Sequence, residues 1–156
     1  MVCDNPKAFA LKRAHQHHIP VVLISPRLFE NRRAYEKVIV RILKNQKVDL
    51  IVLAGFMRIL TPYFVKTYRD KILNIHPSYL PHFKGANAIR DAFEAKVKET
   101  GVTVHWVTNK LDSGPIILQK KVKVLKNDTL ESLKKRIHAV EHQIYPLAIK
   151  QLINKK

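Results

Sequence analysis

Lys71-Ile-Leu-Asn-Ile-His76 is the stretch that decides the fold, because it is a short apolar run that ends in two polar side chains. Such a run is typical of a buried strand. A second apolar run, Asp49-Leu-Ile-Val-Leu-Ala54, precedes it, and Thr61-Pro62 begins a short helix between the two. Strand, helix and strand in this order predict neighbouring parallel strands.

The flanking sequence continues the alternation of helices and strands. On the N-terminal side we expect a helix over 5–18 with Asn5 as its N-cap, a buried strand over 21–24 and a helical region over 26–46. On the C-terminal side we expect a loop over 77–87, a helix over 88–98, a half-buried strand over 101–108, a strand over 116–124 and a helix over 130–153 that Pro146 interrupts or kinks. The whole predicts an α/β fold with a mostly parallel sheet and helices on both faces.

Length and composition indicate one globular domain over residues 1–156. The chain is 46% hydrophobic and 26% charged, which excludes global disorder. The longest apolar run, Leu50 to Met57, is far shorter than the roughly 20 residues of a membrane helix. The first residues, from Met1 on, show no signal-peptide pattern of basic and then apolar residues, and a lone Cys3 forms no internal disulfide. We therefore expect a soluble, cytoplasmic protein with no membrane partner.

The net charge of +17 is the unusual number in the composition. Such a surplus attracts anions, whether nucleic acid, acidic lipid or phosphorylated metabolites, although lysines scattered over helix faces would explain it equally well. A basic nucleic-acid-binding module is thus an alternative from a different class. It lacks a recognition motif, a block of like charges and clustered aromatic residues, so we expect no nucleic-acid partner.

Asn74 and His76 are the first candidates for chemistry. They project to the same face of a strand at its carboxyl end, where ligands of α/β sheets bind. An amide and an imidazole there can polarise a carbonyl and move a proton. Asp112, in a turn after another predicted strand, is a candidate partner for the imidazole. For an isolated histidine, an exposed residue after a strand is the commoner interpretation.

The segment His138-Ala-Val-Glu-His142 fits the H-x-x-E-H pattern of inverted zinc peptidases. Such a site needs a further ligand, and no Asp or Glu follows Glu141 in the sequence. We therefore expect no metal.

Five motifs in order resemble the phosphoribosylglycinamide formyltransferase family, which is folate-dependent and acts in purine synthesis. The motifs are Leu53-Ala-Gly-Phe-Met-Arg-Ile-Leu60, Asn74-Ile-His-Pro-Ser-Tyr-Leu-Pro81, Gly101-Val-Thr-Val-His-Trp-Val107, Leu111-Asp-Ser-Gly-Pro-Ile-Ile-Leu-Gln119 and Glu141-His-Gln-Ile-Tyr-Pro146. The resemblance implies the Rossmann-like formyltransferase fold and transfer of a formyl group from 10-formyltetrahydrofolate to the amine of glycinamide ribonucleotide.

The resemblance also implies roles for single residues. Asn74, His76 and Asp112 are the catalytic trio: the first two stabilise the oxyanion, His76 moves the proton, and Asp112 favours the imidazolium. The residues implied to bind the folate are Arg32, Met57, Arg58, Ile59, Leu60, Asn74 and Asp112. The residues implied to bind the ribonucleotide are Met57, Ile75, Pro77 and Glu141.

One departure from the family concerns the start of the chain. The family begins with a strand, a glycine-rich loop of Gly-x-Gly-Ser-Asn type and a helix that hold the substrate phosphate, and the first residues here match the family downstream of that segment. We therefore expect an N-terminally truncated fold, and the unpaired strand edge leaves self-association open. A formyltetrahydrofolate deformylase-like hydrolase and an inactive remnant are the alternatives within the fold.

Overall fold

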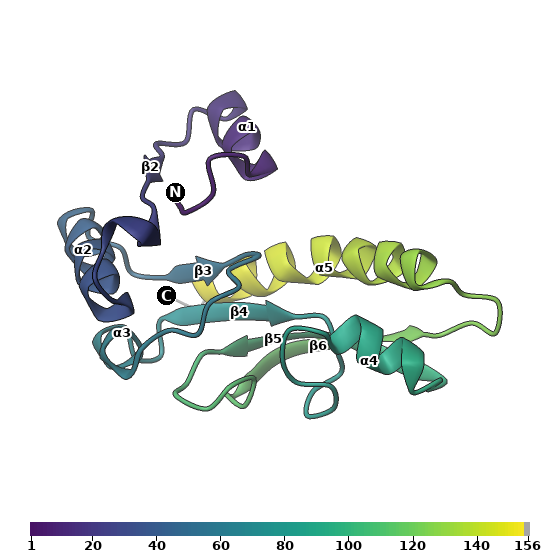
Figure 1. The fold of residues 1–156 in the computed structure, drawn as a ribbon. Helices are drawn as coiled ribbons and strands as arrows, with labels where there is room; N and C mark the ends of the chain where they lie inside the picture. Colours follow the sequence, from purple (N-terminus) through teal and green to yellow (C-terminus); the bar gives the residue numbers. More distant parts are fainter. Residues whose placement is uncertain (155–156) are drawn as a thin grey trace. The chain divides into compact units, whose positions relative to one another are not determined.

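The computed structural model describes residues 1–154. Strand β4 (Ile72–His76) lies inside its four-stranded sheet, whose order is β3-β4-β5-β6 (Figure 1). It pairs in parallel with β3 (Ile51–Leu53) and antiparallel with β5 (Glu99–Trp106), which in turn pairs antiparallel with β6 (Ile116–Lys123). The α/β class is confirmed. The sheet is mixed rather than mostly parallel, because only β3 and β4 pair in parallel and β5 runs antiparallel to both of its neighbours.

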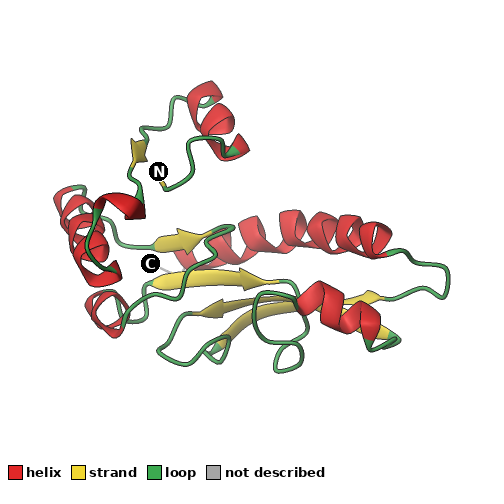
Figure 2. Cartoon of the chain, in the orientation of Figure 1, coloured by secondary structure: helices red, strands yellow, loops and turns green. Residues whose placement is uncertain are grey.

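The chain divides by its internal contacts into two units, Met1–Val48 and Asp49–Lys156. The second unit holds the four-stranded sheet. Its helices are α3 (Pro62–Thr67), α4 (Ala88–Glu94) and α5 (Leu130–Ile153), drawn in red in Figure 2.

The first unit is described by itself. Its elements are β1 (Val2–Cys3), α1 (Phe9–Gln16), β2 (Val22–Leu23), the short 3₁₀ helix η1 (Pro26–Leu28) and α2 (Arg32–Asn45). Strands β1 and β2 pair in parallel as a two-stranded sheet.

The prediction of a buried strand over 21–24 is wrong in its burial. Val22 and Leu23 form β2 as expected, but they are 38% and 52% exposed. A two-stranded sheet of two-residue strands offers them little surface to pack against, so the apolar run predicted the strand correctly and its environment incorrectly.

The boundaries of the N-terminal helices also differ from the prediction. Helix α1 begins after Ala8, since Asn5 accepts a hydrogen bond from the Lys7 amide in a local turn instead of capping the helix. The predicted helical region over 26–46 is two helices, because Asn31 accepts from the Ala34 amide and so caps a new helix, α2.

The core of the second unit lies between the sheet and α5. Leu73, Val102 and Val104 are fully buried, and they pack against the fully buried Leu133 and Ile137 of α5. Ile89 and Phe93 of α4 pack against the same cluster. Because side chains alternate along a strand, this packing commits the residues between them to the opposite face of the sheet.

Strand β5 is buried along most of its length, whereas the sequence predicts a half-buried strand. It lies between two neighbouring strands, so its polar residues Thr103 and His105 are covered as well, at 0% and 2% exposure. The alternation of polar and apolar residues here marks a polar interior and not a solvent-facing side.

Helix α5 runs without a break through Pro146 to Ile153, so the predicted interruption does not occur. Its start is fixed by a capping box between Thr129 and Ser132. Near Pro146, the Tyr145 hydroxyl donates to the backbone carbonyls of Leu53 and Leu73, at 2.6 and 3.1 Å. These contacts tie the helix directly to β3 and β4.

Asp128, just before α5, is a carboxylate with partners on both of its oxygens. Both accept from the Arg136 guanidinium at 2.7 Å, and the Leu125 amide and the Ser132 hydroxyl also donate to it. The guanidinium, and after it the Leu125 amide, hold the pKa of Asp128 well below its usual value. The side chain is 3% exposed.

We predict that Asp128→Asn lowers the midpoint of thermal unfolding at pH 7, because an amide cannot replace charge-assisted bonds to Arg136. The folded-state pKa is depressed, so the stabilisation is complete above the usual value of 3.8 and is lost as the pH falls below it. Thermal unfolding followed by circular dichroism at successive pH values measures the difference in midpoint between wild type and variant. We expect this difference to become smaller in acid.

Glu131→Gln is the matched control for this prediction. Glu131 lies in the first turn of the same helix and pairs with Lys134, but its side chain is 72% exposed. Its removal therefore changes the midpoint less. An equal or larger loss in the Glu131 variant would contradict the role given to Asp128.

Candidate active site

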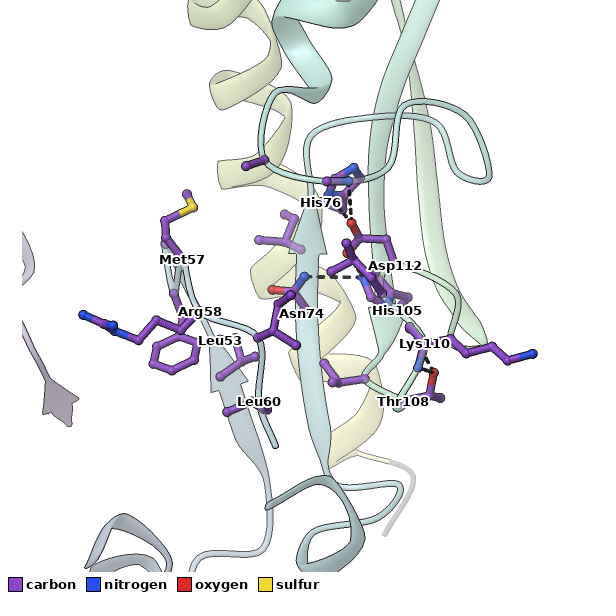
Figure 3. A pocket seen from close by; sticks show the side chains of 18 of the residues that line it. Leu53, Met57, Arg58, Leu60, Asn74, His76, His105, Thr108, Lys110 and Asp112 are labelled. Atoms are coloured by element: carbon purple, nitrogen blue, oxygen red, sulfur yellow. Dashed lines mark hydrogen bonds and ion pairs between the residues drawn. The ribbon is translucent and has the colours of Figure 1, made fainter. Parts of the chain in front are cut away.

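A cavity of about 420 Å³ opens on the sheet face away from the core that α5 covers. Its lining comes from three segments of the second unit: 53–60 after β3, 74–86 at the end of β4, and 105–112 between β5 and β6. Figure 3 shows Asn74 between the side chains of the first segment and the group formed by His105 and Asp112.

The strand register explains why polar side chains meet here. Leu73 and Ile75 point into the core, so Asn74 and His76 point to the cavity. In the antiparallel pair, Asn74 lies opposite His105 and His76 lies opposite Thr103. Directly opposite residues in such a pair are within contact distance.

His76 is 5% exposed and has an oxygen beside each ring nitrogen. Its Nε2 donates to the Phe83 carbonyl at 2.8 Å, because a carbonyl can only accept. Its Nδ1 faces Asp112 Oδ2 at 3.5 Å. The imidazole is therefore held in one orientation between the loop after β4 and the turn before β6.

Asp112 connects the elements of the site. Its Oδ2, besides facing His76, accepts from the Gly85 amide at 2.9 Å, and its Oδ1 lies 3.7 Å from His105 Nε2. The residue has φ +44, in the left-handed region, which Asp tolerates better than most residues.

Gly114 brings the Asp112 turn to its place. A side chain at this position would overlap the Trp106 backbone carbonyl, so only glycine allows the turn to lie against the end of β5. The Trp106 amide also donates to the Pro115 carbonyl at 2.9 Å.

His105 is a site residue that the sequence analysis missed. Its Nδ1 donates to the Trp106 carbonyl at 2.9 Å, and its Nε2 lies 3.4 Å from Asn74 Nδ2. Burial lowers the pKa of His105 below its usual value, and the Trp106 carbonyl and Asp112 offset this only in part. The available signal was that His105 lies on the polar face of a predicted strand, together with Thr103. Because that strand was predicted to be half-buried, its polar face was expected to point to solvent.

The structure brings together most of the residues that the resemblance implied. Asn74, His76 and Asp112 all line the cavity, and so do Met57, Arg58, Ile59, Leu60, Ile75 and Pro77. Arg32 and Glu141 are not among the lining residues. Arg32 begins α2 in the first unit, and Glu141 accepts from His138 Nδ1 at 2.6 Å on α5.

A buried polar cluster fixes the loop that follows His76. The Thr103 hydroxyl donates to the Ser78 carbonyl at 2.7 Å and accepts from the Leu80 amide at 3.1 Å. The Gln119 amide nitrogen donates to both the Thr103 hydroxyl and the Leu80 carbonyl, each at 2.9 Å. The loop so anchored carries the Phe83 carbonyl that His76 contacts.

Neither a metal site nor a membrane-spanning helix is found in the described residues. No group of three or more His, Cys, Asp or Glu side chains within residues 1–154 is arranged to hold a metal ion. Over the same part of the chain, no helix combines the length and the apolar character needed to cross a membrane.

Comparisons with known proteins agree on one family. The family model described as "Formyl transferase" matches residues 1–149. The phosphoribosylglycinamide formyltransferase of Bacillus subtilis is 46% identical over 153 residues, covering 98% of this chain and 78% of that protein. The Escherichia coli protein of the same name is 44% identical over 142 residues, covering 91% of this chain and 67% of its own.

The solved structures lead to the same group. The crystal structure of phosphoribosylglycinamide formyltransferase from Bacillus halodurans superimposes with a TM-score of 0.95 at 44% identity, over 99% of this chain and 79% of that one.

We predict that Thr103→Val lowers the free energy of unfolding by about 2 kcal/mol or more, since each buried group left unpaired costs about 1–3 kcal/mol. Valine keeps the shape but removes the hydroxyl that serves Ser78, Leu80 and Gln119. Denaturant unfolding measures the change. Thr103→Ser keeps the hydroxyl and is the control, and a valine variant as stable as the serine variant would refute the role of the cluster.

Proposed function

The chain belongs to the formyl transferase family, and on that premise we propose that it transfers a formyl group from 10-formyltetrahydrofolate to the amine of glycinamide ribonucleotide, in purine biosynthesis. The observation that carries the proposal is the meeting of Asn74, His76 and Asp112 in one cavity. These are the residues that a formyl transfer needs: a donor to the formyl oxygen, a proton carrier and a charge that orients it.

The cavity fits a folate co-substrate. Its wall over 53–60 is rich in apolar side chains, as ligand pockets usually are, and Met57 and Ile59 are 83% and 60% exposed, so a flat heterocycle can reach them. The opposite wall is the polar group around Asn74. When bound, the folate supplies the formyl group, whose oxygen we place toward the polar wall.

Asn74 donates to the formyl oxygen in this proposal. Its Nδ2 carries two hydrogens, of which His105 engages one, so the second is free to stabilise the negative charge that develops on that oxygen. A donor fixed before the reaction is effective because it needs no reorganisation.

His76 moves the proton. The amine of the ribonucleotide loses a proton as its nitrogen bonds to the formyl carbon, and the folate nitrogen gains one as its bond to that carbon breaks. The Nε2 hydrogen that the Phe83 carbonyl holds at 2.8 Å is the one that His76 offers.

Asp112 orients His76 and balances its charge. It lies 3.5 Å from Nδ1 on the side of the ring opposite to Nε2. A carboxylate there stabilises the imidazolium that forms when His76 takes up a proton.

The remaining assignments are proposals of the same kind. We propose that Arg58, Ile59, Leu60 and Arg32 contact the folate, that Met57 contacts both ligands, and that Ile75, Pro77 and Glu141 contact the ribonucleotide. Both ligands are anionic small molecules, which agrees with the net charge of +17. We propose a cytoplasmic location for this reaction, and self-association stays a prediction.

Hydrolysis of formyl-folate is the alternative within the fold, with water in place of the amine. The relatives described above carry the name of the transferase, which favours the amine. The test is to incubate the chain with 10-formyltetrahydrofolate in the presence and absence of glycinamide ribonucleotide. Folate product that forms only with the ribonucleotide supports transfer, and product that forms equally without it would show a hydrolase.

We predict that His76→Ala reduces kcat/KM by about 10²–10⁴-fold, the usual contribution of a general acid–base group. Steady-state formyl transfer measures the loss. His17→Ala is the control, because His17 is an exposed residue at the end of α1 in the other unit. Near-normal turnover in a folded His76 variant would remove His76 from the mechanism.

We predict that Asp112→Asn reduces kcat/KM by about tenfold or more, because an amide keeps the shape but gives up charge-assisted contacts of about 1.5–3 kcal/mol. Asp70→Asn is a matched control. Asp70 also has a positive φ, +57, yet its side chain is 80% exposed and far less constrained. Equal activity of the two variants would show that the carboxylate charge is not needed.

A further inference from the structure

We propose that His105 is a positioning residue: its neutral ring accepts a hydrogen bond from the Asn74 amide and thereby sets which atoms of that amide face the cavity. No role was assigned to this histidine by the motifs in the sequence. The kinetic part of this proposal rests on the proposed function, whereas its structural part does not.

The surroundings of the ring fix its tautomer. His105 Nδ1 lies 2.9 Å from the Trp106 carbonyl oxygen, which can only accept, so Nδ1 carries the hydrogen. In a neutral imidazole the other nitrogen, Nε2, then has a lone pair and can only accept. The partner at 3.4 Å must therefore be an N–H group, and it is Asn74 Nδ2.

This contact decides the orientation of the Asn74 amide. An amide turned by half a rotation would place its oxygen against the lone pair of His105 Nε2, which is repulsive. With Nδ2 on the His105 side, the oxygen points toward the segment that carries Met57 and Arg58, as Figure 3 shows. The second Nδ2 hydrogen is left for a ligand oxygen.

Burial makes His105 the effective partner of Asn74. The ring is 2% exposed and lies opposite Asn74 in the strand register, so water does not substitute for it. Asn74 itself is half-buried at the edge of the cavity.

Protonation of His105 would reverse the arrangement. A protonated Nε2 has no lone pair and cannot accept from Asn74, and an oxygen of opposite charge, Asp112 Oδ1, lies 3.7 Å away. The two charged or titratable groups that face the ring are this carboxylate, from the turn before β6, and His76, from β4. Burial is the main cause that lowers the pKa of His105, and His76 adds to it, so the neutral ring prevails at neutral pH.

The consequence is a second acid limit on activity. As His105 gains a proton, Asn74 loses its fixed orientation, and Asp112 is drawn from His76 and the Gly85 amide toward the new imidazolium. The rate then falls in acid as the protonated fraction of His105 rises.

The structural part is tested on the ligand-free full chain by two-bond ¹H–¹⁵N correlation of the histidine rings. Peaks of His105 are assigned by their absence in His105→Gln. We expect the tautomer with hydrogen on Nδ1 at pH 7, and side-chain amide signals of Asn74 that shift as His105 titrates. A ring with hydrogen on Nε2, an imidazolium at pH 7, or Asn74 signals that ignore the titration would overturn the proposal.

The kinetic part is tested with a matched pair of variants. In His105→Gln the side-chain oxygen reaches the place of Nε2 and accepts from Asn74 without titrating, whereas the shorter side chain of His105→Asn reaches Trp106 but not Asn74. We expect His105→Asn to lose about tenfold in kcat/KM, the size of one hydrogen bond, and His105→Gln to lose less. The acid limit that His105 sets is absent from the pH profile of His105→Gln.

Equal losses in the two variants, or an unchanged acid limb in His105→Gln, would overturn the positioning role. Thermal unfolding confirms that each variant is folded, and if one is not, the Asn74 titration in the wild-type chain decides alone. A wild-type chain that transfers no formyl group would refute the proposed function, while the tautomer measurement would still decide the role of His105.

Discussion

The alternation of side chains along β4 is the constraint on which the rest of the structure depends. Leu73 and Ile75 must enter the core beneath α5, and so Asn74 and His76 must face the cavity. Antiparallel pairing with β5 then places His105 and Thr103 directly opposite them. A shift of one residue in this register would exchange the two faces, burying the amide and the imidazole in an apolar core. The hydrophobic core and the polar site are therefore set by the same pairing, and neither can change alone.

The carboxylate of Asp112 joins what the strands alone would leave separate. It meets His76 from β4, His105 from β5 and the Gly85 amide from the loop between them. A buried charge with fewer partners would be costly, since removal from water is repaid only by several good contacts. Its position depends in turn on Gly114, which lets the turn approach Trp106. The site is thus held by a small number of backbone contacts around one charge.

The sequence predicts the elements well where the apolar runs are long, and less well where partners decide. The strand at Ile72–His76, the capped helix at Thr61 and the convergence of Asn74, His76 and Asp112 on one site all follow from local residues and the resemblance. The exposure of Val22 and Leu23 does not, because an apolar run carries no information on whether neighbours cover it. His105 was missed because its partners come from β4 and from the turn before β6, which are distant in the sequence. A local alternation of polar and apolar residues cannot show whether the polar side faces solvent or a polar interior. Pro146 lies inside α5 because the packing of Tyr145 and Ala148 outweighs a local preference to break.

The residues that we propose for the chemistry all lie in one of the two units, and this bears on how precisely they can be held. Asn74, His76, His105 and Asp112 fall within Asp49–Lys156, so their mutual distances are set by one sheet and its loops. Groups on one rigid sheet can be held in a more precise geometry than groups on separate units. An oxyanion donor is effective because its position is fixed before the reaction. A histidine that is kept neutral by burial and turned toward Asn74 is one means to that end. On our proposals the site has two imidazoles with different tasks: His76 carries a proton in the reaction, and His105 stays neutral and holds Asn74.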